Sequence, residues 1–161
     1  GVSSGLGIGP KHINKILGIT KAYTTRVGEG PFPTELFDED GASLAKIGHE
    51  FGATTGRTRR CGWLDLHALK KIILINSLTQ LCITQLDVID SFKSIKVCID
   101  YEDGKPIYET FQGWLEEISE IKKFENLPIP AQKYISYIED YLKVPVTVVS
   151  VGPDRDQTVH K

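Results

Sequence analysis

Apolar and polar positions alternate along the chain with two periods, one typical of helices and the other of strands. Apolar residues that recur every three or four positions predict helices over residues 10–17, 42–47, 66–78, 114–121 and 130–142. Runs of β-branched and other apolar residues predict strands within 19–27, 81–84, 95–101 and 146–151. Because strands alternate with helices, the pattern predicts an α/β fold with a mostly parallel sheet and flanking helices.

Local details sharpen several of these elements. Asp65 is expected to cap the helix over 66–78, because an Asp side chain accepts a hydrogen bond from a free backbone N–H of the first turn. Residues 72–75 of that helix are apolar on nearly every side, which predicts that the helix is well buried. Residues 146–151 form an almost unbroken β-branched run, typical of a strand buried on both faces. The turn residues 102–104 predict a hairpin after the strand that precedes them.

The composition is that of an ordinary globular domain. The chain has 161 residues, 40% hydrophobic and 25% charged, so we expect a single domain over residues 1–161 and no intrinsic disorder. Its formal net charge of -2 excludes a wholly basic nucleic-acid-binding protein but not a local basic patch. No apolar run reaches the roughly 18–20 residues that a membrane helix needs. The cysteines show no metal-binding spacing and no C-x-x-C pair, so a cytoplasmic protein is expected.

The richest candidate for a binding site is the polar segment over 51–63. It contains arginines but no carboxylate, and its threonines and glycines supply hydroxyls and accessible backbone N–H groups. Arginine side chains bind carboxylates and phosphates through paired, charge-assisted hydrogen bonds. The segment therefore predicts a site for an anionic ligand, with a solvated basic loop as the alternative. The residues concerned are Gly52, Thr54, Thr55, Gly56, Arg57, Arg59 and Arg60.

Two further candidates come directly after predicted strands, where open α/β sheets bind ligands. The first is the segment 84–87, whose Asp87 carboxylate accepts hydrogen bonds and suits the ring N–H and exocyclic amine of guanine. The second is the segment 150–156, which begins Ser-Val-Gly-Pro. Ordinary turns are the alternative for both segments, since Asp, Gly and Pro are common turn residues.

Several common catalytic signatures are missing from the sequence. There is no G-x-x-x-x-G-K-[ST] phosphate loop, and the glycines over 5–9 do not fit G-x-G-x-x-G. The histidines share no metal-ligand spacing, and no G-x-S-x-G elbow indicates a hydrolase. The sequence therefore gives no direct sign of a dinucleotide-binding enzyme or a serine hydrolase.

Taken together, the segments 21–36, 48–65, 84–90 and 149–156 resemble the adenylosuccinate synthetase family. Their order and approximate spacing match from end to end, so the resemblance extends over essentially the whole chain. It implies the C-terminal part of a P-loop-NTPase-like synthetase fold. It also implies that the phosphate loop, the catalytic Asp and His and the Mg²⁺ ligands lie upstream of Gly1. No catalytic or metal-binding residue is therefore expected in this chain, which is expected to be inactive alone.

In that family, a ligase condenses IMP with L-aspartate to adenylosuccinate in the synthesis of AMP, with GTP as co-substrate. GTP phosphorylates the hypoxanthine oxygen, and the amine of aspartate then displaces the phosphate. The resemblance implies the same small-molecule substrates here, with Mg²⁺ as cofactor. It further implies a cytoplasmic homodimer for the complete enzyme, with no nucleic-acid or membrane partner.

The resemblance also assigns roles to individual residues. The loop that closes on aspartate corresponds to Ala53, Thr54, Thr55, Gly56, Arg57, Thr58 and Arg59. Within it, Arg57 resembles the residue that contacts both aspartate and the IMP ribose, and Arg59 resembles the residue that reaches GTP. The residues that correspond to the GTP base pocket are Gln85, Leu86, Asp87, Ser150, Val151 and Gly152. One position departs from the family's usual pattern, because Gln85 stands where most members have Lys.

Two other classes of protein are alternatives to the ligase. A non-catalytic nucleotide- or RNA-binding module would use the patch formed by Arg59 and Arg60. The net charge of -2 and the lack of aromatic residues within that patch argue against RNA. A small GTPase-like switch is disfavoured by the missing phosphate loop. The sequence upstream of Gly1 would decide between these classes.

Overall fold

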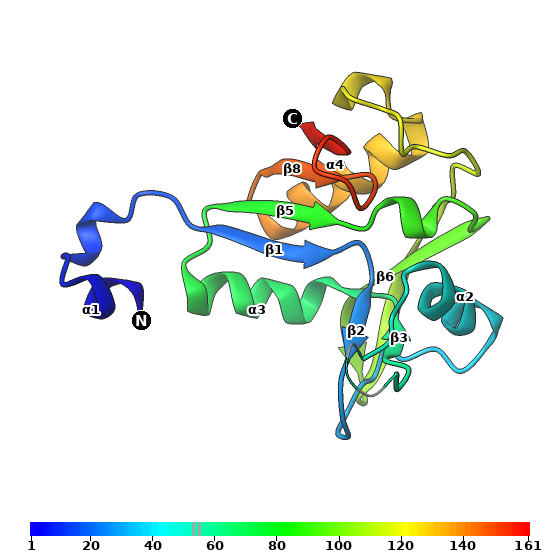
Figure 1. Cartoon of the computed structure of the whole chain (residues 1–161). Coiled ribbons are helices and arrows are strands. Elements are labelled where there is room, and N and C mark those ends of the chain that lie inside the picture. The colour runs from blue at the N-terminus through cyan, green and yellow to red at the C-terminus, as the bar shows by residue number, and fades with distance from the viewer. Residues whose placement is uncertain (53, 55) are drawn as a thin grey trace.

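The computed structural model describes residues 1–52, 54 and 56–161, which form three β-sheets with helices packed around them (Figure 1). The largest sheet has the strand order β1-β5-β8-β9. Strands β1 (Leu17–Lys21), β5 (Gln80–Thr84) and β8 (Val146–Ser150) are parallel, and β9 (Thr158–His160) is antiparallel to β8. The predicted α/β class is confirmed, and this sheet is the mostly parallel one.

The two smaller sheets are antiparallel or mixed. Strand β2 (Thr24–Arg26) pairs antiparallel with β3 (Arg60–Gly62). In the other sheet, β4 (Leu64–Asp65) is parallel to β6 (Ser94–Glu102), and β7 (Lys105–Gln112) is antiparallel to β6. The predicted strand region 19–27 is therefore two strands in two sheets, β1 and β2.

The predicted hairpin after 95–101 is confirmed. Asp103 and Gly104 connect β6 to β7, and both have a positive φ, 49° and 76°. A left-handed conformation at both central residues is typical of a type I′ turn, for which Asp-Gly is a favoured sequence.

Three of the predicted helices, over 42–47, 66–78 and 130–142, are confirmed. The α-helices among the described residues are α1 (Val2–Leu6), α2 (Glu39–Ile47), α3 (Leu66–Asn76) and α4 (Ile129–Leu142). The 3-10 helices are η1 (Pro10–His12), η2 (Asp87–Ile89) and η3 (Phe124–Asn126). As predicted, Asp65 caps α3 by accepting a hydrogen bond from the Ala68 N–H at 2.8 Å. None of the helices in the described part of the chain has the length and apolar character that crossing a membrane requires.

The predicted helix over 10–17 is wrong. Only η1 is helical there, and Leu17 is the first residue of β1. Pairing of β1 with β5 prevails over the local helical spacing of apolar residues. Gly18 allows close packing in this strand, since a Cβ there would lie 2.4 Å from Leu78 Cδ1. The sheet contact is long-range, and local periodicity does not reveal it.

The predicted helix over 114–121 is also wrong. Residues 113–118 form an irregular segment in which Trp114 and Ile118 are nevertheless buried. Asp90 holds this segment, because its carboxylate accepts hydrogen bonds from Trp114 Nε1 at 2.5 Å and from the Ile118 N–H at 3.1 Å. Leu115 has a φ of 53°, which is incompatible with a right-handed helix. Hydrogen bonds to the Asp90 side chain thus stabilise this segment, in place of the backbone hydrogen bonds of a helix.

The predicted burial of the second half of α3 is wrong for most of its residues. Ile73 is 6% exposed, but Ile72, Leu74 and Ile75 are 47%, 76% and 80% exposed. Ile19 on the neighbouring edge strand β1 is 74% exposed. The described residues cover only one side of α3, so a helix that is apolar all round is buried on one face only.

Strand β8 confirms the predicted strand over 146–151. It pairs with β5 on one side and β9 on the other. Val146 and Val149 are buried, whereas Thr147 and Val148 are half-buried. The expected burial on both faces is therefore only partly correct, because one face of the sheet remains incompletely covered by the described residues.

Each sheet contains one buried cysteine without a disulfide, namely Cys61 in β3, Cys82 in β5 and Cys98 in β6. Burial raises the pKa of the Cys61 thiol to about 11, and it also raises the pKa of Cys82 and of Cys98. Within the described part of the chain, no cluster of three or more His, Cys, Asp or Glu side chains could hold a metal ion. The three cysteines are therefore interior side chains of separate sheets.

Candidate functional site

The basic segment forms a loop closed by a short antiparallel stem, and we refer to residues 51–59 as the basic loop. At the base of the stem, the Arg59 N–H donates to the Glu50 carbonyl at 2.8 Å. Further out, the Gly52 N–H donates to the Arg57 carbonyl at 2.9 Å, and the two residues between these pairs form a β-bridge. The loop therefore leaves and rejoins the body of the protein at one place, between α2 and β3.

Most of the predicted ligand-binding residues of this loop lie at the surface. Thr54, Gly56, Arg57 and Thr58 are exposed, and Arg59 is half-buried. Ala53 and Thr55, to which the resemblance assigns aspartate binding, lie outside the described residues. The loop thus carries two threonine hydroxyls and the Arg57 guanidinium at the surface, with Arg59 half-buried at its base.

A buried carboxylate lies at the base of the basic loop. Glu50 is 1% exposed, and its Oε1 accepts hydrogen bonds from Lys21 Nζ and from the Tyr23 hydroxyl, each at 2.5 Å. Its Oε2 accepts a hydrogen bond from Arg59 Nη1 at 2.9 Å. Burial alone would raise the pKa of Glu50, but the bonds from these three donors outweigh it and hold the pKa below its ordinary value. Glu50 is therefore an ionised group that fixes Arg59.

Sequence reasoning did not single out Glu50. It noted this residue only as the last carboxylate before an acid-free stretch that ends at Asp65. A single acid at the edge of an arginine-rich segment is the signal that could have indicated a buried ion pair. Its other partners, Lys21 and Tyr23, come from β1 and the residues after it, and no local pattern connects them to the loop.

A cavity of about 80 Å³ lies between the basic loop and the residues that follow β2, and four arginines line it: Arg26, Arg57, Arg59 and Arg60. Arg60 donates to both carboxylate oxygens of Glu35 and to the carbonyls of Gly28 and Gly30. Arg26 donates to the carbonyl of Pro31 at 2.9 Å. Arg26 and Arg60 therefore hold the neighbouring turn, and the positive lining of the cavity suits a small anion.

This arrangement argues against the alternative of an RNA-binding patch at Arg59 and Arg60. Each guanidinium is paired with a carboxylate that is mostly buried, Glu50 for Arg59 and Glu35 for Arg60. A backbone-binding patch needs cations whose charge is not already neutralised by the protein. With a net charge of -2 as well, the protein does not offer at this patch the run of unpaired cations that a nucleic-acid backbone needs.

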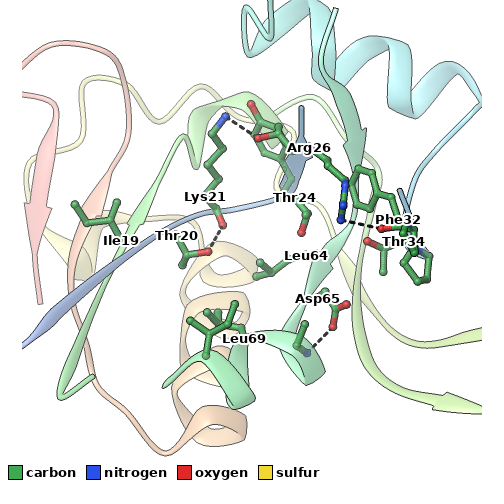
Figure 2. Close-up of a pocket in the computed structure, with 16 residues that line it drawn as sticks. Ile19, Thr20, Lys21, Thr24, Arg26, Phe32, Thr34, Leu64, Asp65 and Leu69 are labelled. Carbon is green, nitrogen blue, oxygen red and sulfur yellow. Dashed lines mark hydrogen bonds between the residues drawn. The ribbon is translucent and has the colours of Figure 1, made fainter. Parts of the chain in front are cut away.

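A larger hollow of about 510 Å³ opens between β1, β2 and the start of α3 (Figure 2). Ile19 and Leu69 contribute apolar side chains to its lining, while Lys21, Arg26 and Asp65 contribute charged ones. The Asp65 carboxylate is engaged at the N-terminus of α3, where it acts as the cap. Sequence reasoning did not predict this hollow, because its lining comes from segments that are far apart in the chain.

The two segments predicted at strand ends meet in the structure, and we refer to residues 84–87 and 150–152, which the resemblance assigns to a base pocket, as the strand-end pocket. The Leu86 N–H donates to the Ser150 carbonyl at 3.1 Å, which joins the ends of β5 and β8. Gln85 has a φ of 58°, and its side-chain amide donates to the Gly48 carbonyl at 3.3 Å. Because Gly48 follows α2 and comes shortly before the basic loop in the chain, this bond links the pocket to the C-terminal end of α2.

Asp87 is the chemically unusual residue of the strand-end pocket. Its Oδ1 is buried and has no hydrogen-bond partner among the described residues. Burial raises the pKa of the Asp87 carboxyl, because the charged form loses its water. A buried polar atom without a partner is rare and costs about 1–3 kcal/mol. Asp87 is therefore a partly desolvated carboxylate at the carboxyl end of parallel strands, the edge at which open α/β sheets bind ligands.

The opposite wall of the pocket is fixed by bonds within the chain. The Ser150 hydroxyl donates to the Gly152 carbonyl at 2.8 Å, and the Val151 N–H donates to the Gln157 carbonyl at 2.9 Å. Gly152 approaches Gln157 so closely that a Cβ would lie 2.2 Å from its Oε1. These bonds fix the backbone of the wall, and a larger residue at Gly152 would disturb it.

The comparison with family profiles decides the relationship of this chain. The profile of the adenylosuccinate synthetase family matches residues 1–159. The chain belongs to the adenylosuccinate synthetase family. The resemblance recognised in the four sequence segments is thereby confirmed.

Similarity to individual adenylosuccinate synthetases supports the same assignment. The enzyme from Neisseria meningitidis serogroup C (strain 053442) is 51% identical over 175 residues, which cover 98% of the chain and 40% of that protein. The one from Chlorobium chlorochromatii (strain CaD3) is 50% identical over 178 residues, which cover 100% of the chain and 41% of that protein. The fully ligated adenylosuccinate synthetase from Plasmodium falciparum matches with a TM-score of 0.94 and 42% identity, covering 99% of the chain and 43% of that structure. The chain thus spans about two fifths of the length of these synthetases.

Proposed function

We propose that the chain supplies the basic loop and the strand-end pocket of a GTP-dependent ligase that condenses IMP with L-aspartate to adenylosuccinate. It forms the C-terminal part of that enzyme, and the catalytic residues belong to the part that precedes it. Membership of the adenylosuccinate synthetase family and the fold shared with the Plasmodium falciparum synthetase support this proposal.

The observation that carries the proposal is the unpartnered Oδ1 of Asp87. Guanine presents a ring N–H and an exocyclic amine side by side, and an ionised carboxylate accepts hydrogen bonds from both. Adenine presents an acceptor at the ring position, which would face Asp87 with repulsion. A buried, unsatisfied carboxylate at this position therefore favours GTP over ATP.

The remaining residues of the pocket enclose the base. Ser150, Val151 and Gly152 form the wall opposite Asp87, and Leu86 joins this wall to β5. Gln85 replaces the family's usual Lys, so its side chain supplies packing and a hydrogen bond but no positive charge. GTP binding therefore depends on Asp87 for selectivity and on the arginines nearby for charge.

The basic loop supports the second half of the proposal, the binding of aspartate. Thr54 and Arg57 supply a hydroxyl donor and a guanidinium for the two carboxylates of aspartate, and Arg57 also contacts the IMP ribose. Arg59 reaches the nucleotide. This division suits the chemistry, because fixed cations that position two anionic substrates provide most of the catalytic effect in phosphoryl transfer.

The phosphoryl-transfer machinery itself lies outside this chain in our proposal. The described residues offer no group of acidic, His or Cys side chains suited to Mg²⁺, which agrees with a site for the ion in the part of the enzyme outside this chain. The complete enzyme is proposed to be a cytoplasmic homodimer. This chain's part is to recognise the guanine base and to orient aspartate against the activated IMP.

The test compares the complete enzyme with the chain alone. The full-length protein that carries this chain should form adenylosuccinate from IMP, aspartate and GTP, at about 1–100 turnovers per second. The isolated chain should show no turnover, because it lacks a phosphate loop and a general base. Product is measured by the ultraviolet absorbance change that accompanies adenylosuccinate formation.

Two outcomes would contradict the proposal. A full-length protein that is well folded but makes no adenylosuccinate would show that family membership does not extend to the activity. Turnover by the isolated chain at the rate of the full-length protein would show that the catalytic residues have been placed in the wrong part of the enzyme.

A further inference from the structure

Glu50, at the centre of a charge cluster at the base of the basic loop, has no ligand-binding role in the assignments above. Glu50 lies between two cations, and each of its oxygens contacts one of them. Oε1 lies 2.5 Å from Lys21 Nζ, and Oε2 lies 2.9 Å from Arg59 Nη1. The Tyr23 hydroxyl donates to Oε1 from within the core. The carboxylate is therefore held by three donors, and in turn it holds both cations in place.

Arg59 is fixed in a way that leaves donors for a ligand. Its Nη1 binds Glu50, whereas its Nε is buried and has no partner among the described residues. A guanidinium carries five N–H donors in a rigid, planar fork, so fixing one of them restricts the direction of the others. Arg59 also lines the cavity of about 80 Å³. The Arg59 side chain is 36% exposed, so the guanidinium that Glu50 fixes still presents donors at this arginine-lined cavity to an anionic acceptor.

From this geometry we infer that Glu50 is a positioning residue of the ligase, which orients the Arg59 guanidinium toward the nucleotide without contacting the nucleotide itself. The inference rests on the proposed function, in which Arg59 reaches GTP. A free Arg side chain has many rotamers, and restricting them before the ligand arrives improves binding and alignment. Glu50 performs this restriction through a bond that the folded core holds in place.

A second ion pair in the same region provides a matched comparison. Glu35 binds Arg60 through both carboxylate oxygens, but Arg60 also donates to the carbonyls of Gly28 at 3.2 Å and Gly30 at 2.9 Å. The donors of Arg60 are thus used within the protein. Loss of Glu35 should therefore weaken the fold, whereas loss of Glu50 should also misdirect a ligand-binding side chain.

The experiment compares Glu50→Gln with Glu35→Gln in the full-length enzyme. For Glu50→Gln, we expect the Michaelis constant for GTP to rise about 10-fold or more, because a charge-assisted contact made through Arg59 is weakened. The Michaelis constant for IMP should change by less than about 2-fold, since Arg59 does not contact IMP. Glu35→Gln should lower the midpoint of thermal unfolding and leave both Michaelis constants near those of the parent enzyme.

A double-mutant cycle separates positioning from general damage. Glu50→Gln is introduced into the parent and into an Arg59→Leu variant, and the Michaelis constant for GTP is measured in all four proteins. If Glu50 acts through Arg59, its replacement should have no further effect when Arg59 is absent. If Glu50→Gln does not fold, Glu50→Asp replaces it, because Asp keeps the charge but is one methylene too short to reach both cations.

The outcomes are distinct. An equal rise in the Michaelis constant for GTP in both backgrounds, or no rise in the parent, would overturn the positioning role while leaving the proposed function intact. If the parent enzyme makes no adenylosuccinate, the proposed function and this inference fall together. A rise confined to the background that contains Arg59 supports the inference.

Discussion

Asp87 and Arg57 carry opposite charges, and the protein holds them in opposite ways. Asp87 lies in the strand-end pocket, where its Oδ1 is out of contact with water even without a ligand. Arg57 lies on the basic loop, where its side chain is exposed. For Asp87, part of the cost of desolvating the carboxylate is met when the chain folds, so less of that cost remains when a ligand binds. For Arg57, water is lost only on binding, so the net gain is smaller.

The surroundings of Asp87 are also held more firmly than those of Arg57. The strand-end pocket joins the ends of β5 and β8 through the bond between Leu86 and Ser150, and its wall at Gly152 is closely packed. The described part of the basic loop is joined to the body at its stem, where Glu50 binds the backbone and the side chain of Arg59. The comparison suggests a division of labour in which the pocket decides which nucleotide binds and the loop adapts to the smaller substrate.

The largest effect is expected when the buried charge is removed. Asp87→Ala in the full-length enzyme should raise the Michaelis constant for GTP at least about 100-fold, because guanine loses two buried bonds of about 1.5–3 kcal/mol each. The order of preference GTP, then ITP, then ATP should flatten, since ITP lacks the exocyclic amine and ATP lacks the ring N–H. Michaelis constants for the three triphosphates, with thermal unfolding as a folding control, provide the measurement. An unchanged order of preference would mean that the base is recognised elsewhere.

A smaller effect is expected at the exposed loop. Arg57→Leu should raise the Michaelis constant for aspartate about 10-fold, since a charge-assisted bond at an exposed site lies near the lower end of its range. The constant for GTP should change much less. Arg60→Leu is the control, because Arg60 is bound to Glu35 and should affect stability instead. If Arg57→Leu impairs GTP binding and spares aspartate, the roles of Arg57 and Arg59 have been exchanged.

The smallest effect is expected on the pH dependence of stability, at Asp90, which directly follows η2. Burial raises the pKa of Asp90 to about 6 from an ordinary value of 3.8, although bonds from Trp114 and Ile118 oppose the rise. Between about pH 4 and 6, the folded protein keeps a proton that the unfolded chain has released. The Asp90 contribution to stability therefore falls as pH rises through this range. Asp90→Asn should flatten the pH dependence of thermal unfolding there, and an unchanged slope would exclude Asp90 as its source.

The sequence predicted those elements whose bonds are local. The cap at Asp65, the turn at Asp103 and Gly104 and the helix α4 each follow from residues a few positions apart. The helices expected over 10–17 and 114–121 failed because distant groups decide their structure, namely the pairing of β1 with β5 and the carboxylate of Asp90. Apolar periodicity shows which side chains avoid water, but not which neighbour covers them.

The same distinction applies to the candidate site. Asp87 and Ser150 were predictable as a pair, because parallel strands end at the same edge of a sheet and each residue follows or ends a strand. Glu50 was not predictable, because its ionised, buried state exists only when Lys21, Tyr23 and Arg59 converge on it. Pairwise long-range contacts of this kind leave almost no pattern in a single sequence.

The distribution of cysteines gives this protein a built-in set of reporters for local opening. A thiol is alkylated only as an accessible thiolate, and both burial and a raised pKa suppress the reaction in the folded state. Because Cys61, Cys82 and Cys98 belong to three different sheets, the order in which they are alkylated records the order in which those sheets separate. Alkylation of Cys61 thus reports when the sheet next to the basic loop opens, and alkylation of Cys82 reports when the sheet that ends at the strand-end pocket opens. Both can be followed in the protein without any substitution.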